Sequence, residues 1–191
     1  MVRTEGAADL PVKVKVLHRP ITRPRLELIP WELRVVIPEN LGEDYAYGLI
    51  DKHRRWITRK YRQLREAAVK AEKLELVDRA PDEFKRLVRS LARRYAEELG
   101  VKVKGVYVRI MTRKWGSCSF RGNINMSSLA RYLPDELVEY LVYHEVCHLV
   151  ERSHGKRFWR LVALRFPNYG ELREKLLAYQ VKLAMLGLLR L

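Results

Sequence analysis

The residues best suited to chemistry lie in the segment Tyr143–His154, where two histidines stand four positions apart. On a helix, His144 and His148 lie one turn apart on the same face, so both imidazoles can reach one metal ion. Glu145 lies one position around the helix, where it can reach a metal-bound water without being a ligand. This HExxH arrangement predicts a hydrolase in which zinc acidifies a water and Glu145 accepts its proton as the general base.

The helix that carries these residues has an apolar face that continues into them. The alternative interpretation is a pair of core histidines and a core glutamate, each with its own hydrogen-bond partner. Burying an unpaired carboxylate beside two imidazoles costs several kcal/mol, and a bound metal removes that cost. The pattern therefore favours a metal site. The apolar positions lie on two neighbouring stripes: Leu137, Leu141, Val138, Val142 and Leu149.

A third ligand is expected shortly after the helix. His154 follows His144 by ten residues, which is the spacing of HExxHxxGxxH metal sites. Glu151 stands where that pattern has glycine, so the turn after the helix must be made by the two residues that follow. Glu151 itself and the distant Glu171 are the alternative ligands. We favour His154, because zinc sites with an open position commonly use three neutral histidines.

Other residues have weaker claims to a role. Arg113 is a candidate for stabilising the negative charge that develops during the reaction. The strand at 124–126 precedes the active-site helix, and its edge is a candidate for pairing with an extended substrate. His18 and His53 have no partner nearby in the sequence and are expected to be ordinary surface or packing histidines. Neither cysteine has an adjacent base, so a cysteine nucleophile is not expected.

The amino-acid composition indicates the class of protein and the cellular compartment to expect. Apolar residues make up 48% of the 191 positions, enough for a real hydrophobic core. The only cysteines are Cys118 and Cys147, so we expect no disulfide framework and a reducing compartment. The first residues have no apolar signal segment, and the most apolar stretch, interrupted by Lys182, is too short to span a membrane. We therefore expect a cytoplasmic protein with no membrane partner.

The chain is strongly basic, with 38 Lys and Arg against 23 Asp and Glu and a net charge of +15. Such a balance favours acidic partners such as nucleic acid or nucleotides. The alternative is that the charge serves solubility alone, because charge by itself identifies no fold and no reaction. The candidate surface is the basic face of an expected helix over residues 44–74, where four arginines fall within about two turns: Arg54, Arg55, Arg59 and Arg62.

Periodicity, proline and glycine outline the elements that hold the site. Alternating apolar residues indicate strands at 11–17, 25–29 and 32–37, interpreted as a small antiparallel meander before the long helix. Pro81 begins a second helix that Gly100 ends. Three further strands follow, and Pro134 then opens the helix with the site. These later strands are expected at 101–111, 112–120 and 123–127, and two last helices at 155–165 and 171–189.

This order of elements predicts an α+β fold. We expect an N-terminal region of meander and basic helix at residues 1–78 and a catalytic region at 79–191, although one continuous domain fits the pattern too.

Several short motifs occur together in the second half of the chain. They are Arg113–Cys118 (RKWGSC), Gly122–Asn125 (GNIN), Leu133-Pro134, His144–His148 (HEVCH) and His154–Trp159 (HGKRFW). This combination, which is far more specific than HExxH alone, resembles the YgjP-like metal-dependent hydrolases. The similarity is strong from about Val108 to Trp159 and weaker through the N-terminal strands and the long helix.

The resemblance implies a zincin-like catalytic core, a small antiparallel sheet with the HExxH helix, related to minimal gluzincins and to the SprT and Spartan proteases. It implies His144, His148 and His154 as zinc ligands and Glu145 as the catalyst. The expected function is that of a zinc metallopeptidase acting on a peptide or protein substrate. Two alternatives stay open: a nucleoside-triphosphate pyrophosphatase, and a non-enzymatic nucleic-acid-binding module stapled by zinc.

Overall fold

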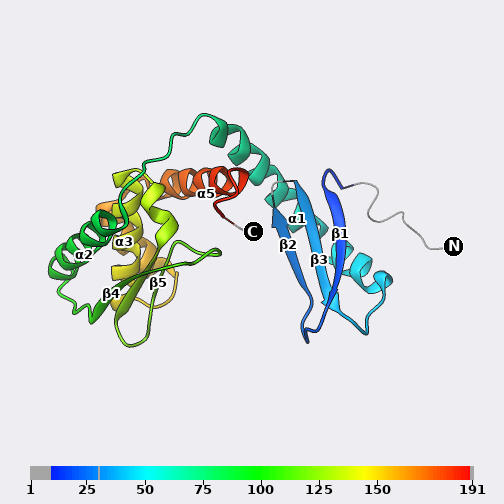
Figure 1. The fold of residues 1–191 in the computed structure, drawn as a ribbon. Helices are drawn as coiled ribbons and strands as arrows, with labels where there is room; N and C mark the ends of the chain where they lie inside the picture. Colours follow the sequence, from blue (N-terminus) through cyan, green and yellow to red (C-terminus); the bar gives the residue numbers. More distant parts are fainter. Residues whose placement is uncertain (1–9, 30, 190–191) are drawn as a thin grey trace. The chain divides into compact units, whose positions relative to one another are not determined.

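The computed structural model describes residues 10–29 and 31–189 (Figure 1). The chain divides into two compact units, the first ending at Glu72 and the second beginning at Lys73. Each unit has its own hydrophobic core. The boundary expected at residue 78 lies a few residues further along. The segment between belongs to the second unit, where the Val77 N–H donates to the Tyr132 carbonyl at 3.0 Å.

The first unit is a three-stranded sheet with a long helix. Strands β1 (Lys13–Arg19), β2 (Arg25–Ile29) and β3 (Glu32–Pro38) precede helix α1 (Glu43–Glu72). The strand order is β1-β3-β2, with β1 parallel and β2 antiparallel to β3. The expected antiparallel meander is therefore wrong for β1. Strand β3 takes the centre because its residues 33 and 35–37 are all buried, and so apolar a strand is best covered by a neighbour at each edge.

The second unit contains a second small sheet and four α-helices among the described residues. Its elements are α2 (Pro81–Glu98), β4 (Gly105–Arg109), β5 (Gly116–Cys118), β6 (Asn123–Ser127), a 3₁₀ helix (Ser128–Tyr132), α3 (Asp135–Val150), α4 (Lys156–Arg165) and α5 (Tyr169–Met185). The α+β class is thus confirmed. No helix among the described residues is long and apolar enough to cross a membrane.

The sheet of the second unit is mixed rather than antiparallel. Its order is β4-β6-β5, with β4 parallel and β5 antiparallel to β6. The prediction that residues 124–126 offer an edge to substrate is therefore wrong, because they lie in the central strand. Ile124 and Met126 are fully buried there, which explains the position. Strand β5, which packs against α3, has an edge with which no strand pairs among the described residues.

Two glycines make the turns that the sequence indicated. Gly100 ends α2 at a φ of 62°, and Gly122 joins β5 to β6 at a φ of 82°. Both angles lie in the left-handed region, which glycine adopts without steric cost.

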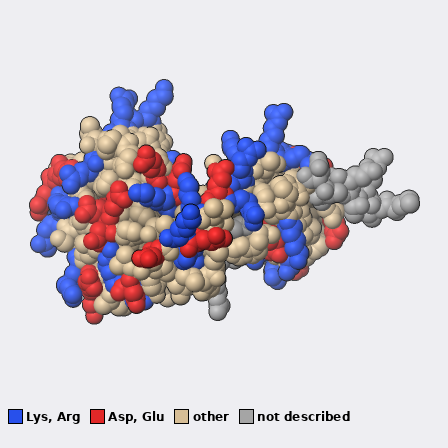
Figure 2. Space-filling model, turned by 90° about the horizontal axis from the view of Figure 1, so that it is seen from above, with Lys and Arg blue, Asp and Glu red and all other residues tan. Residues whose placement is uncertain are grey.

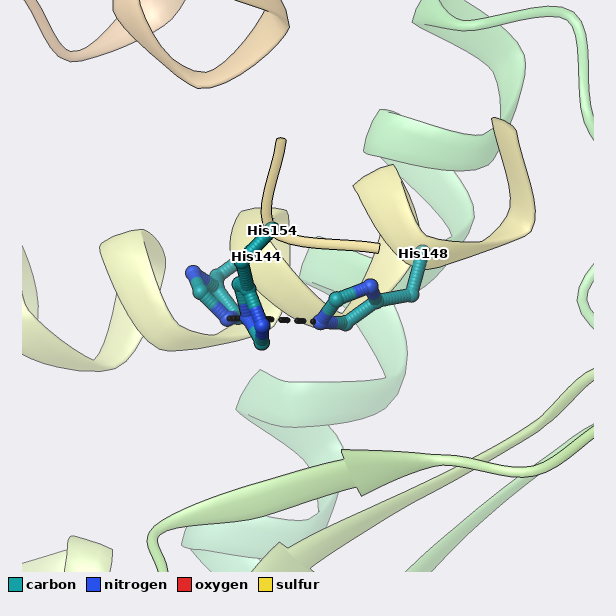
Figure 3. Close-up of side chains that lie close together, drawn as sticks. All are labelled: His144, His148 and His154. Atoms are coloured by element: carbon teal, nitrogen blue, oxygen red, sulfur yellow. Dashed lines mark hydrogen bonds between the residues drawn. The ribbon is translucent and has the colours of Figure 1, made fainter. Parts of the chain in front are cut away.

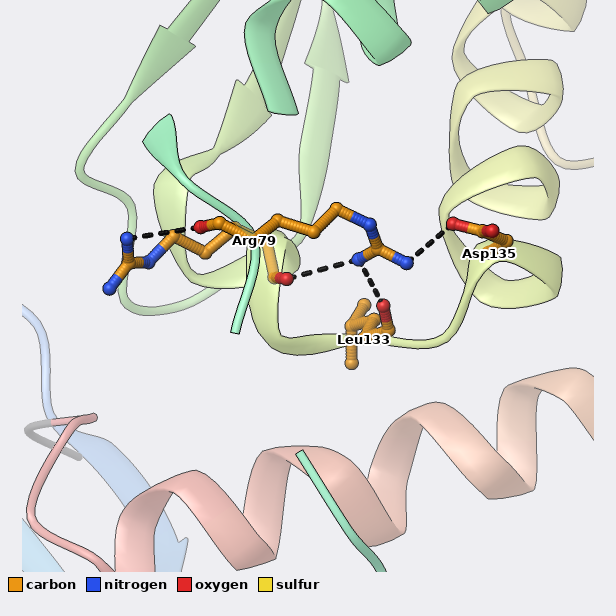
Figure 4. Close-up of polar contacts among 4 residues, drawn as sticks. Arg79, Leu133 and Asp135 are labelled. Carbon is orange, nitrogen blue, oxygen red and sulfur yellow. Dashed lines mark hydrogen bonds and ion pairs between the residues drawn. The ribbon is translucent and has the colours of Figure 1, made fainter. Parts of the chain in front are cut away.

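A buried arginine fastens the start of the second unit to the start of α3 (Figure 4). Arg79 is only 7% exposed. Its guanidinium donates to the carbonyls of Arg131 and Leu133 and to the carboxylate of Asp135. The Arg131 side chain returns a hydrogen bond to the Arg79 carbonyl at 3.2 Å. These contacts hold the loop before α3 and therefore the position from which the site helix begins.

Candidate metal centre

Three histidine side chains meet in the second unit (Figure 3). His144 and His148 come from successive turns of α3, and His154 comes from the loop after it. The Nε2 atom of His154 lies 3.0 Å from Nε2 of His144 and 3.1 Å from Nε2 of His148. Within residues 10–29 and 31–189, no other group of three His, Cys, Asp or Glu side chains is placed to hold one ion.

Burial favours the neutral form of the two imidazoles on α3, those of His144 and His148. Burial lowers the pKa of His144 to about 3, and burial also lowers the pKa of His148. The Nδ1 atom of His148 lies 3.2 Å from the Glu151 carbonyl, which suits a hydrogen on Nδ1 and leaves the Nε2 lone pair directed at the cluster. Neutral imidazoles with a free nitrogen are the form that a metal requires.

The loop after α3 needs no glycine at position 151. Glu151 has a φ of −132°, an extended backbone that any residue adopts. Its carboxylate accepts hydrogen bonds from the Ser153 N–H at 3.3 Å and the Ser153 hydroxyl at 3.1 Å. The Glu151 side chain thus shapes the turn, while His154 joins the other two histidines. Glu171, at the start of α5, also lies outside the histidine group.

Arg152 anchors this loop, a role that the sequence analysis missed. Its guanidinium donates to the Ser119 carbonyl at 3.0 Å and the Phe120 carbonyl at 3.2 Å, and it lies 5.2 Å from the centre of the Phe120 ring. These partners lie 33 and 32 residues earlier in the chain, so the local sequence around Arg152 does not predict the contacts.

The Phe-Trp pair that follows His154 packs the imidazoles into place. Phe158 is fully buried, and its ring centre lies 4.8, 4.5 and 4.7 Å from those of His144, His148 and His154. Trp159 stacks on His154 with an angle of 27° between the rings. Such contacts restrict the rotation of all three ligand candidates.

Glu145 lies against strand β5 and is only 5% exposed. A Cβ atom at Gly116 would lie 2.6 Å from its Oε1 atom, so this carboxyl rests directly on the glycine backbone. The Oε2 atom is buried without a hydrogen-bond partner among the described residues. Burial raises the pKa of Glu145 to about 7, although Lys114 and a hydrogen bond from the Cys118 N–H act in the opposite direction.

The histidines and Glu145 line one cleft of about 530 Å³. Three cations also line it: Lys114, Arg152 and Arg173. Arg113, the predicted charge-stabilising residue, is exposed in the loop before β5, and its neighbour Lys114 faces the cleft instead. Cys118 is a further lining residue, and burial raises the pKa of its thiol, which disfavours the thiolate of a nucleophile.

The comparison with family models decides the relationship, because the model described as "YgjP-like, metallopeptidase domain" matches residues 76–179. The chain belongs to the YgjP-like metallopeptidase family. The matched range of this YgjP-like domain contains every residue that lines the cleft.

The similarity to an individual curated protein covers a smaller part of the chain than the family model does. The YgjP-like chain is similar to the UTP pyrophosphatase of Escherichia coli (strain K12), with 26% identity over 68 residues, which is 36% of this chain and 41% of the relative. The match thus spans about two-fifths of that relative's length.

Two solved structures are also similar. The metallopeptidase zymogen abylysin of Pyrococcus abyssi is 26% identical, with a TM-score of 0.43, over 47% of this chain and 90% of that one. The zymogen jannalysin of Methanocaldococcus jannaschii is 19% identical, with a TM-score of 0.43, over 47% of this chain and 92% of that one.

The donor set of the YgjP-like domain fits a zinc ion. Tetrahedral zinc with Zn–N bonds of about 2.0–2.1 Å requires nitrogens about 3.3 Å apart, close to the 3.0 and 3.1 Å that separate these Nε2 atoms. The buried Nδ1 atom of His144 has no partner among the described residues, so His144 relies on packing for its orientation.

Proposed function

We propose that this YgjP-like domain is a zinc-dependent metallopeptidase in which His144, His148 and His154 hold the metal and Glu145 is the general base. The observation that carries the proposal is the meeting of three imidazoles and one buried carboxyl in a single cleft. Membership of a metallopeptidase family supports the coarser assignment as a metal-dependent hydrolase.

Zinc, when bound, supplies a Lewis acid that polarises the scissile carbonyl and acidifies a water. Glu145 takes the proton of the attacking water and later gives it to the leaving amine. A pKa near 7 suits both steps, because the carboxyl can then accept and release a proton at neutral pH. Lys114, which lines the cleft, is our candidate for stabilising the negative charge that develops during the reaction.

The open edge of β5 supports an extended substrate. The main-chain groups of Trp115 and Ser119 point toward β6. The Ser127 N–H donates to the Trp115 carbonyl at 2.7 Å, and the Ser119 N–H donates to the Asn123 carbonyl at 2.8 Å. In an antiparallel pair, the main-chain groups of Gly116 therefore point to the other edge. A peptide that adds there as a strand would pass beside Glu145.

The test is cleavage of an unfolded protein, and of protein bound to single-stranded DNA, by zinc-loaded protein purified without a His tag. Glu145→Gln keeps the shape of the side chain but cannot accept the proton, so we expect unchanged zinc content and turnover lower by about 10²–10⁴-fold. A near-normal rate in Glu145→Gln would contradict the role of the base. A fully zinc-loaded wild type that cleaves no polypeptide would contradict the peptidase.

A nucleotide pyrophosphatase is the second candidate, and the cleft cations favour it. Lys114, Arg152 and Arg173 line the cleft, and Glu145 is the single acidic residue among the described residues that line it, which suits a triphosphate. The similarity to a UTP pyrophosphatase points the same way. Pyrophosphate release from a panel of nucleoside triphosphates, measured on the same preparation, distinguishes the two activities.

The non-enzymatic alternative has less support. A structural zinc site uses four protein ligands and needs no base, whereas here three histidines share a cleft with Glu145, whose buried Oε2 atom has no hydrogen-bond partner among the described residues. Leaving such an atom without a hydrogen bond lowers the stability of the folded protein by about 1–3 kcal/mol, and a purely structural zinc site gains nothing in return.

A further inference from the structure

Another groove lies in the second unit, between helix α2 and strand β4, which Figure 1 shows next to each other. It consists of three adjoining hollows of about 480, 200 and 440 Å³. The first and second share Arg89 and Val106, and the second and third share Lys85, Val108 and Arg109. None of the residues that line these hollows lines the histidine cleft.

One wall of this α2–β4 groove is a row of cations. Lys85, Arg89 and Arg93 stand four positions apart along α2, so they form one exposed stripe. Arg109 and Lys102 add positive charge from the β4 side, and the acidic lining residue is Glu97. Among the described residues, Arg89 and Arg93 have no acidic partner, whereas Lys85 pairs with the exposed Asp82 at 3.0 Å.

The other wall is the edge of a sheet. Strand β4 pairs with β6 on one side, and among the described residues no strand pairs with its other side. The main-chain N–H and C=O groups of alternate β4 residues therefore face the groove, ready to pair with another extended chain. Val106 and Val108 contribute a partly buried apolar floor.

The two walls run in opposite directions with matched spacing. As the lining residues on α2 descend from Arg93 to Lys85, those on the strand side ascend from Val101 to Arg109. Cations four residues apart on a helix repeat about every 6 Å, and alternate side chains of a strand repeat about every 6.6–6.8 Å. A strand added to β4 would thus bring every second side chain to one cation of the stripe.

We propose that the α2–β4 groove docks an extended acidic peptide segment of a partner protein, with acidic residues at alternate positions and main-chain pairing to β4. The charge of the groove complements such a peptide, and the strand edge complements its backbone. A single-stranded nucleic acid fits less well, because its bases require aromatic platforms. The exposed ring in the groove is Tyr107, which already lies under the Arg109 guanidinium at 5.3 Å.

The test is fluorescence anisotropy with labelled heptapeptides, using full-length Glu145→Gln protein so that the probes stay intact. One probe alternates Glu and Thr, and a second has the same composition with its glutamates in one block. We expect the alternating probe to bind about tenfold tighter, because only it presents its charges at the spacing of the stripe. N-methylation of alternate residues on its pairing edge should abolish this preference. Equal binding of the alternating and block probes, or undiminished binding of the N-methylated probe, would overturn strand addition.

Variants locate the binding surface. Arg89→Glu/Arg93→Glu should bind the alternating probe at least about tenfold more weakly and should acquire affinity for a Lys/Thr probe. Arg86→Glu/Arg160→Glu changes the net charge equally at exposed positions outside the groove and should bind like the parent. If both double variants lose affinity equally, or oligothymidine displaces the peptide and binds more tightly, the proposal is wrong. Even if a variant fails to fold, the comparison of the alternating and block probes on the parent protein still tests whether the peptide binds by strand addition.

Discussion

Gly116 leaves the space in which the Glu145 carboxyl lies. Because an added Cβ would come within 2.6 Å of Oε1 and 2.8 Å of Cγ, an alanine must displace the side chain or the strand. We predict that Gly116→Ala lowers turnover by about 10²-fold, as expected for a misplaced general base, with zinc content unchanged. The measurement is the rate on an established substrate together with elemental analysis.

Gly170→Ala is the matched control for this prediction. Nothing lies within 4 Å of a Cβ at Gly170, so the variant should keep its rate. A fully active Gly116→Ala enzyme would mean that the carboxyl position matters less than the contact suggests.

The third ligand gives a second prediction at this scale. His154→Ala should lower zinc affinity by at least about 10-fold, because it removes one of three converging Nε2 atoms. Glu151→Ala should keep its zinc, since the hydrogen bonds of that carboxylate in the described part of the chain go to Ser153. Competition with a chelating dye measures both affinities. The reverse order of effects would make Glu151 the ligand.

The histidines and Glu145 could be predicted because their relation is local. A spacing of four on a helix determines that His144 and His148 share a face, whatever surrounds them. The presence of Lys114 and Arg173 in the cleft could not be predicted, because these residues come from other segments of the chain and belong to no recognisable sequence motif for such a role. The same applies to Arg152, whose partners depend on how the β5–β6 turn packs against the loop.

At the scale of elements, helix α1 presents a continuous basic stripe to solvent. Arg54 is partly buried and pairs with Asp51 at 2.9 Å, so the exposed cations matter more than the sequence suggested. They recur at intervals of three or four residues along one face: Lys52, Arg55, Arg59 and Arg62.

We predict that this stripe binds a polyanion such as single-stranded DNA or RNA, with an affinity that falls steeply as salt rises. Arg55→Gln/Arg59→Gln/Arg62→Gln should weaken binding and reduce the slope of log K against log salt by about 2–3, because each lost phosphate contact removes about 0.7–0.9 from it. Arg54→Gln is the control with a small effect. Anisotropy titrations at several salt concentrations measure these quantities, and the absence of binding at low salt would leave the stripe a solubility feature.

Helices and several strand positions could be predicted, whereas strand pairing could not. Strand β2 begins and ends where its alternating pattern does, and α1 differs from the expected helix by one or two residues at each end. The parallel pairings of β1 with β3 and of β4 with β6 join segments that are distant in the chain. Their register depends on which strand is buried in the centre, and a local period of two contains no information about that.

At the scale of the whole molecule, the net charge of +15 is made up of 38 basic and 23 acidic residues. Figure 2 shows Lys and Arg intermingled with Asp and Glu on the face drawn. The exposed cations that recur along single helix faces, as on α1 and α2, are the local concentrations of positive charge to which our binding predictions refer.

The two hydrophobic cores draw on separate parts of the chain. The core of the first unit uses residues between Leu10 and Tyr61, and that of the second uses residues between Leu74 and Tyr179. All residues that line the histidine cleft lie in the second unit. The candidate metal centre and the core that supports it therefore come from one continuous stretch of sequence.

We predict that a chain beginning at Lys73 folds, binds zinc and hydrolyses a short substrate at a rate close to that of the full chain. A chain beginning at Asp82 is the matched control. It lacks Arg79, whose guanidinium satisfies two carbonyls and pairs with Asp135, and it lacks Leu74 and Leu76, which pack against the core. Losing the buried hydrogen bonds alone costs about 1–3 kcal/mol, a large part of the stability of a small domain.

Thermal unfolding followed by circular dichroism, with elemental analysis, compares these two chains. The longer one should unfold cooperatively with bound zinc, and the shorter one should melt at least several degrees lower or fail to fold. If the chain from Lys73 did not fold or held no zinc, the second unit would depend on the first, and the separation of the two cores would not extend to their stability. If the chain from Asp82 were equally stable, the contacts of Arg79 would contribute little.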